Sequence, residues 1–147
     1  MDNCMKKIRF SFIFFVLIIA SSLFAETEGE KLFKNNDPSG AIPLLEKDIA
    51  TGSISADTYN FLGLSYYQIG NLPKSLEAFE KGMNSPLSNK KVLSFNQGNV
   101  AYSSGDYKKA ETSFSLALAA SPTFYGALWK RANARLMSQK YPEALED

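Results

Sequence analysis

The feature that most constrains the fold of this chain is a 17-residue pattern that occurs twice. Residues 63–79 read GLSYYQIGNLPKSLEAF, and residues 98–114, which begin 35 positions later, read GNVAYSSGDYKKAETSF. A weaker third copy follows about 34 residues after the second. A repeat of this period predicts a stack of similar units. The positions in register are Gly63 with Gly98, Tyr67 with Tyr102, Gly70 with Gly105, Lys74 with Lys109 and Phe79 with Phe114, and the third copy keeps Ala132, Tyr141 and Ala144.

Each unit has the pattern of two helices joined by a tight turn. Apolar residues spaced three and four apart predict a helix in the first half of the unit. A glycine then ends that helix in the left-handed conformation, and a polar residue after it caps the next helix. In the first copy these residues are Gly70 and Asn71. In the second copy we expect helices over Lys90–Ser103 and Tyr107–Ala120.

Two glycines lie inside the predicted helices. Gly63 and Gly98 occupy positions where glycine costs roughly 1 kcal/mol relative to alanine. Because Ala132 takes the third equivalent position, the site requires a small residue rather than a flexible one. We therefore expect the paired helix to approach closely at this point. The residues expected across the hairpin are Ser75, Ala110 and Ala144, with Leu62, Tyr66, Phe79 and Phe114 filling the space towards the neighbouring unit.

The repeat resembles the tetratricopeptide repeat family. The resemblance implies an all-α fold, a right-handed α-solenoid of about 3.5 stacked antiparallel helix hairpins, and it says almost nothing about function. Gln139 departs from the pattern, because it stands where the second unit has Gly105. The residues that carry the resemblance are Tyr59, Leu62, Gly63, Tyr66, Gly70, Ser75 and Phe79, then Gly98, Gly105, Ala110, Phe114, Ala117 and Pro122, then Leu128, Ala132, Tyr141 and Ala144.

The repeat also divides the chain. A signal segment over residues 1–25 precedes a degenerate helix pair over 26–55. Repeat units follow over 56–89 and 90–123, and an incomplete unit over 124–147 ends the sequence. In the degenerate pair the signal segment occupies the place of most of the first helix. This division predicts one domain, since length allows about one at roughly 150 residues each.

The N-terminal segment has the pattern of a secretory signal peptide. Lys6, Lys7 and Arg9 precede an uncharged run over residues 10–25 that ends in small residues. Cleavage after Ala25 and cleavage after Ser22 stay open, as do an uncleaved anchor and a translation start at Met5. We expect the protein to be exported from a bacterial cytoplasm, and to be periplasmic or anchored in the inner membrane facing the periplasm.

The composition removes several classes of function. The chain has no histidine, and Cys4 is its only cysteine, which excludes histidine-based catalysis and His/Cys zinc sites. The formal charge is +1, and without residues 1–25 there are 13 basic and 14 acidic side chains. A nearly neutral body lacks the field that holds nucleic acid. We therefore expect no enzyme, no cofactor, no metal and no nucleic-acid partner, and membrane contact only through an uncleaved N-terminal segment.

The first helices of stacked hairpins line a concave face in the family that the chain resembles. Several asparagines fall on this face, and they predict amide groups that bind an extended peptide or a chain terminus. A solvated polar face is the alternative. A full carboxylate clamp of that family is rejected, since Leu64 and Gly126 stand where it needs asparagine and lysine. The outward-facing candidates are Asp57, Asn60, Tyr67, Asn96, Asn99, Tyr102, Lys130 and Asn133, while Glu111, Glu143 and Glu146 are expected to be solvated charges.

The sequence leaves three functions open. The first is an exported scaffold that binds a protein or peptide partner, or assembles an envelope complex, through its concave face. The second is the N-terminal repeat region of a longer protein whose activity lies downstream of residue 147. The third is a carrier of a small ligand or peptide. Self-association through the uncovered apolar face near Leu128, Leu136 and Leu145 is a further expectation.

Overall fold

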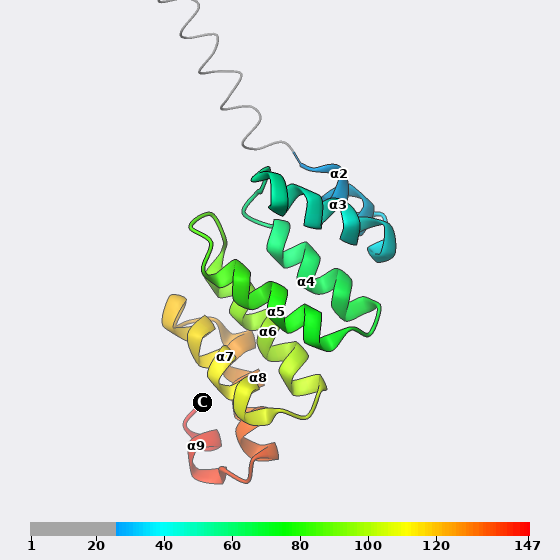
Figure 1. Cartoon of the computed structure of the whole chain (residues 1–147). Coiled ribbons are helices and arrows are strands. Elements are labelled where there is room, and N and C mark those ends of the chain that lie inside the picture. The colour runs from blue at the N-terminus through cyan, green and yellow to red at the C-terminus, as the bar shows by residue number, and fades with distance from the viewer. Residues whose placement is uncertain (1–25) are drawn as a thin grey trace, which may run out of the picture.

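The computed structural model describes residues 26–147, and this part of the chain is helical, with eight helices and no strand (Figure 1). The helices pair into hairpins α2–α3, α4–α5, α6–α7 and α8–α9. None of the described helices is long and apolar enough to cross a bilayer. The bounds are α2 Glu28–Lys34, α3 Pro38–Thr51, α4 Thr58–Gln68, α5 Leu72–Met83, α6 Lys90–Ser103, α7 Tyr107–Ala120, α8 Tyr125–Met137 and α9 Tyr141–Leu145.

The turn of each hairpin contains one residue in the left-handed region. These residues are Asn36, Gly70, Gly105 and Gln139, with φ between 60° and 82°. The three earlier hairpins also have a side chain that caps the following helix: Asp37, Asn71 and Asp106 each accept a hydrogen bond from a backbone N–H three residues on. The last hairpin has Lys140 at this position, and it makes no side-chain cap bond. The predicted bounds of α6 and α7 and the predicted glycine turns are confirmed.

The predicted glycines lie directly against buried rings of the paired helix. A Cβ atom added at Gly63 would lie 2.5 Å from Cε1 of Phe79, and one added at Gly98 would lie 2.5 Å from Cε1 of Phe114. Both rings are fully buried. Ser75 lies across the first of these contacts and donates a hydrogen bond to the Gly63 carbonyl at 2.7 Å. The expectation that a small residue is needed here is confirmed.

The hairpins stack so that their first helices form a continuous row. Among the described helices, α2 contacts α4, α4 contacts α6, and α6 contacts α8, whereas α3, α5 and α7 do not contact one another. Each second helix instead packs on the first helix of the next hairpin (Figure 1). The row is therefore the inner face of a solenoid, and the second helices lie on its outer face. This confirms the predicted fold class.

Aromatic side chains join successive hairpins in the core. The Phe95 ring lies 5.7 Å from the Phe114 ring within its own hairpin and 4.7 Å from the Phe124 ring of the next unit. Near the N-terminal end of the described residues, the rings of Phe33 and Phe61 lie 5.1 Å apart. Tyr66, predicted to point inward, is 5% exposed.

Candidate partner-binding face

The candidate site is the inner face formed by α4, α6 and α8. Figure 1 shows these helices at successive levels of the stack, so that one partner can contact several units. Their side chains on this face come from positions that recur with the repeat. The predicted residues are divided among the helices as Asn60 and Tyr67 on α4, Asn96, Asn99 and Tyr102 on α6, and Lys130 and Asn133 on α8, with Asp57 just before α4.

Two of the predicted residues are bonded to each other. The side-chain nitrogen of Asn96 donates a hydrogen bond to Oδ1 of Asn60 at 2.8 Å, across the junction of α4 and α6. Asn60 is only 8% exposed, so the expectation that it faces outward is wrong. A buried amide must be hydrogen-bonded, and here the neighbouring unit supplies the partner. This pair connects two hairpins; a role for either residue in binding a partner stays a prediction.

A second side-chain bond crosses the same junction. The hydroxyl of Tyr67 lies 3.2 Å from Oγ of Ser103, which is also 36 residues later in the chain. The same separation holds for the asparagine pair, so each of these residues of α4 contacts the residue one place after its equivalent in α6. Tyr67 is 37% exposed, so part of its ring remains available at the surface.

Asn99 differs from the other asparagines. Its Oδ1 atom is buried and accepts no hydrogen bond from any residue in the range 26–147. The residue as a whole is half-buried, although Oδ1 itself is closed to solvent. By contrast, Nδ2 of Asn133 already donates to the Trp129 carbonyl at 2.9 Å within α8. Asn99 is the amide on this face that most needs an external donor.

On α8, the inner face carries one lysine that lies close to two aromatic rings. The ammonium group of Lys130 lies 5.9 Å from the centre of the Tyr102 ring and 5.5 Å from that of the Trp129 ring. The other edge of Tyr102 packs against Tyr107, with ring centres 5.2 Å apart. The structure thus brings the predicted Tyr102 and Lys130 together. Asp57 stays apart from them, as an exposed N-cap residue without a side-chain cap bond.

Polar contacts at both ends of the stack could not be predicted from the repeat pattern. At the N-terminal end, Glu30 is 4% exposed and accepts hydrogen bonds from Thr58, at 3.1 Å, and from Ser55. At the other end, Glu111 was expected to be a solvated charge, and this is wrong. Its side chain is 16% exposed and accepts from Arg135 at 2.9 Å and from Lys140 at 2.7 Å. The missing signal was the pair of arginines that replaces uncharged residues at two repeat positions.

The outer face has two open grooves between second helices. One has a volume of about 340 Å³, lies between α3 and α5 over α4, and carries two carboxylates and two ammonium groups, from Glu46, Glu77, Lys74 and Lys81. The other, of about 480 Å³, lies between α5 and α7 over α6. Its lining is more apolar and includes Met83 and Leu116. Within residues 26–147, no cluster of three or more carboxylates or other metal-ligating side chains occurs.

Part of the repeat region matches a known protein family. The sequence profile of the tetratricopeptide repeat family matches residues 95–147. Residues 95–147 thus match a tetratricopeptide repeat, and the described residues have the fold of this repeat. A comparison with curated proteins finds no significant match.

Solved structures of MamA have a similar fold. One superposes with a TM-score of 0.72 at 18% identity, covering 84% of this chain and 71% of that one. A second gives a TM-score of 0.71 at 22% identity, covering 80% and 64% of the two chains. A third, MamA AMB-1, gives 0.66 at 23% identity, covering 80% and 69%. At these identities the likeness establishes the tetratricopeptide fold and leaves the function of this chain to its own surface.

Proposed function

We propose that this chain is an exported, non-catalytic scaffold that binds a protein or peptide partner on the inner face of α4, α6 and α8, and so assembles an envelope complex. Tetratricopeptide folds serve mainly to bind proteins, which makes this class of function the first to test. The signal-like segment over residues 1–25 supports the exported location.

The observation that carries the proposal is the buried, unpaired Oδ1 atom of Asn99. Leaving such an acceptor without a donor costs about 1–3 kcal/mol. We propose that the Asn99 side chain turns when an extended peptide lies along the inner face, so that a backbone N–H of the peptide supplies the missing donor. Tyr102 lies one helix turn further along α6, and Lys130 lies on α8. They offer the same peptide an aromatic edge and a positive charge.

The experiment is a pull-down with the full chain from envelope extract, read out by mass spectrometry. Asn99→Ala should reduce capture of the partner about tenfold, because the amide contact is lost. The control is Asn84→Ala, an equal truncation at the outer end of α5, where Nδ2 donates only to the Glu80 carbonyl. Undiminished capture by Asn99→Ala, or an equal loss with Asn84→Ala, would count against the inner face.

Export requires a separate test. Intact mass of the protein purified from the periplasmic fraction distinguishes cleavage after Ser22, cleavage after Ala25 and an uncleaved anchor. We expect a cleaved protein in that fraction. Recovery of the full-length chain from the cytoplasm would contradict export and leave the partner-binding proposal to the pull-down.

A second candidate function is self-association through α8. Tyr125, Trp129 and Leu136 are 77%, 64% and 45% exposed. The equivalent residues of the preceding unit, 34 positions earlier, all contact the next hairpin. Lys91 lies 5.5 Å and Phe95 4.7 Å from the Phe124 ring, and Tyr102 lies against Lys130. The exposed side chains of α8 thus occupy positions that stack on another hairpin elsewhere in the molecule.

We propose that a hairpin of a second copy covers this surface. Sedimentation velocity of the full chain over a hundredfold concentration range should show association for the wild type. Trp129→Glu should abolish it, because a charge is introduced at the centre of the contact. Leu116→Glu, which changes a 50% exposed leucine on the outer face, is the control and should associate like the wild type. A monomer at all concentrations would refute the proposal.

A further inference from the structure

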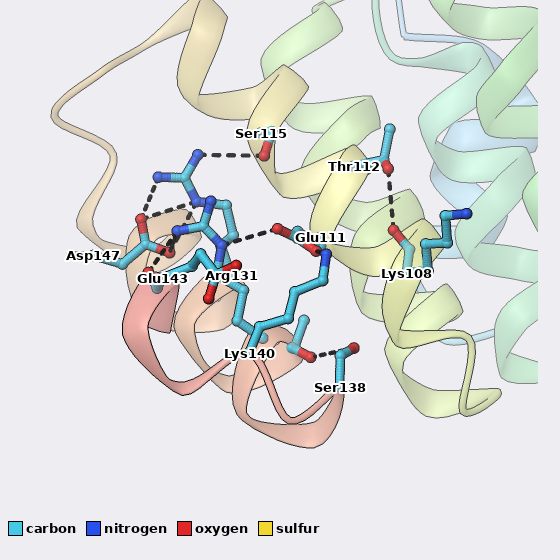
Figure 2. Close-up of polar contacts among 11 residues, drawn as sticks. Lys108, Glu111, Thr112, Ser115, Arg131, Ser138, Lys140, Glu143 and Asp147 are labelled. Atoms are coloured by element: carbon cyan, nitrogen blue, oxygen red, sulfur yellow. Dashed lines mark hydrogen bonds and ion pairs between the residues drawn. The ribbon is translucent and has the colours of Figure 1, made fainter. Parts of the chain in front are cut away.

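The last hairpin contains a cluster of ionic side chains that the proposed function does not use (Figure 2). Nε of Arg131 donates to both carboxylate oxygens of Asp147, at 3.0 and 2.9 Å. Nη1 of Arg135 donates to the second of these oxygens at 3.0 Å. Nη1 of Arg131 also donates to Oγ of Ser115 at 3.3 Å. Two guanidinium groups therefore bind one carboxylate, and Ser115 accepts a hydrogen bond from one of them.

This cluster is largely excluded from water. The Asp147 side chain is 2% exposed, and those of Arg131 and Arg135 are 19% and 15% exposed. Glu111, held by Arg135 and Lys140, lies beside it. Three cations thus share two carboxylates, which leaves the cluster with a net charge of +1. Without Asp147 the remaining groups would carry +2, with Lys140 43% exposed and the other side chains largely buried, which favours an anion there.

The arginines stand where the other units have uncharged residues. Position by position, Arg131 corresponds to Leu62 and Gln97, and Asp147 corresponds to Ala78 and Ser113. Leu62 and Ala78 lie in one apolar cluster, and Oγ of Ser113 donates to Oε1 of Gln97 at 2.8 Å. The contact between residues 16 positions apart is therefore apolar in the α4–α5 hairpin, polar and uncharged in the α6–α7 hairpin, and ionic in the α8–α9 hairpin. Stacking of the repeat does not require charges at this position.

The helix that brings Asp147 to the arginines is weakly held otherwise. α9 has five residues, none of them buried, and its N-cap makes no side-chain bond. Its apolar side chains Tyr141 and Leu145 are 58% and 88% exposed. Its contacts are mainly polar: Asp147 with the arginines, Lys140 with Glu111, and the Glu143 carbonyl with Arg135 at 2.7 Å.

We propose that Arg131, oriented by Ser115, and Arg135 form a phosphoryl-binding site, which the Asp147 carboxylate fills while α9 is docked and which a phosphoryl group takes when α9 undocks. Arginine forks bind carboxylates and phosphates with the same paired geometry. A phosphoryl dianion balances the +2 charge of the vacated cluster, whereas a carboxylate leaves +1. Charge complementarity therefore favours a phosphoryl ligand over the internal aspartate once both compete.

The test uses inorganic phosphate as the probe and the full chain at constant ionic strength, followed by amide chemical shifts. Asp147→Asn removes the internal anion, so phosphate should bind at least tenfold more tightly than to the wild type, with shifts around Ser115 and Arg131. Adding Arg131→Gln to that variant should weaken binding at least tenfold. Glu146→Gln removes the same charge from the exposed neighbouring residue and should bind phosphate like the wild type.

A phosphoserine peptide and its unphosphorylated form distinguish a protein-borne phosphoryl group from free phosphate. Equal phosphate affinity of Asp147→Asn and the wild type overturns the proposal, as does unchanged binding after Arg131→Gln. Circular dichroism establishes that each variant is folded. If Asp147→Asn does not fold, Asp147→Ser offers the same vacated site, and the same two affinities decide. The outcome is independent of the inner face, which none of these variants alters.

Discussion

The α4–α5 and α8–α9 hairpins occupy equivalent places in the repeat but are held together by different interactions. In the first, a glycine meets a buried ring and Leu62 packs beside Ala78. In the second, Ala132 replaces the glycine, and Arg131 binds Asp147. The hairpin architecture thus tolerates a change from apolar to ionic packing. The change makes the last hairpin dependent on charge and the earlier one dependent on close packing.

The largest expected effect comes from filling the space at a glycine. Gly98→Leu should lower the free energy of unfolding by about 3 kcal/mol or more, since the new side chain would enter the space of the Phe114 ring. Ala132→Leu is the matched change in the last hairpin and should cost less than ~1 kcal/mol. Thermal melting of both variants checks this difference, and equal losses would remove the contrast between the hairpins.

The two hairpins should respond to opposite extremes of pH. Burial and the hydrogen bond to Glu46 raise the pKa of Tyr66 from its ordinary value of 10.0 to about 12. Since the neutral phenol is favoured in the folded state, this contribution is complete below pH 10 and is lost as the pH rises towards 12. At most ~2–3 kcal/mol is involved. Alkaline denaturation of Tyr66→Phe, which should lack this loss, is the check.

Acid should instead weaken the α8–α9 hairpin. The hydrogen bond from Lys140, aided by that from Arg135, lowers the pKa of Glu111 below its ordinary value of 4.5, although burial opposes it. The ionised form is favoured in the folded state, so this stabilisation is present above pH 4.5 and is lost as the pH falls through the lowered pKa. Amide exchange in α9 should therefore rise in acid before that of α4, and Glu111→Gln should remove the difference.

The intermediate hairpin allows a smaller test of polar packing. Ser113→Ala alone should cost about 1–2 kcal/mol, because it leaves Oε1 of Gln97 buried without its donor. Adding Gln97→Leu recreates the Leu62 and Ala78 pair of the α4–α5 hairpin. The double variant should be within ~0.5 kcal/mol of the wild type or above it. A double variant less stable than the single one, by urea denaturation, would show that the polar pair is required.

The smallest expected effect concerns the turn before α9. Gln139 has φ of 60°, a conformation that costs a residue with a side chain roughly 1 kcal/mol relative to glycine. Gln139→Gly should therefore raise stability by up to ~1 kcal/mol and slow amide exchange in α9. Gly105→Gln, the reverse change in the α6–α7 turn, should lower it by a similar amount. A stabilising effect of both changes would contradict this account.

The sequence was most informative where the backbone itself sets the requirement. Gly63 and Gly98 predicted a close approach, and in the structure a Cβ atom added at either glycine would lie 2.5 Å from a buried phenylalanine ring. Gly70 and Gly105 predicted turns with positive φ, which the structure also has. These are local or repeat-encoded requirements, so periodicity reveals them. The bounds of α6 followed from the same pattern.

The inner face could be predicted only in outline. Repeat positions placed Asn60 and Asn96 on it, but periodicity does not tell whether two amides on adjacent helices face solvent or each other. The acceptor of Asn99 is unpaired because of its exact rotamer and neighbours, which no spacing encodes. Glu111 was misplaced for a related reason: its cations come from residues 24 and 29 positions away, on elements of a different unit.

The separation of the outer helices has a mechanical consequence. Since α3, α5 and α7 contact only first helices, whereas α2, α4, α6 and α8 contact one another, we expect the described stack to be stiffer along its inner edge than along its outer edge. Small rotations of the hairpins would open or narrow the grooves between second helices while the side-chain bonds at the α4–α6 junction keep their length. We therefore expect a bound partner to change the curvature of the stack.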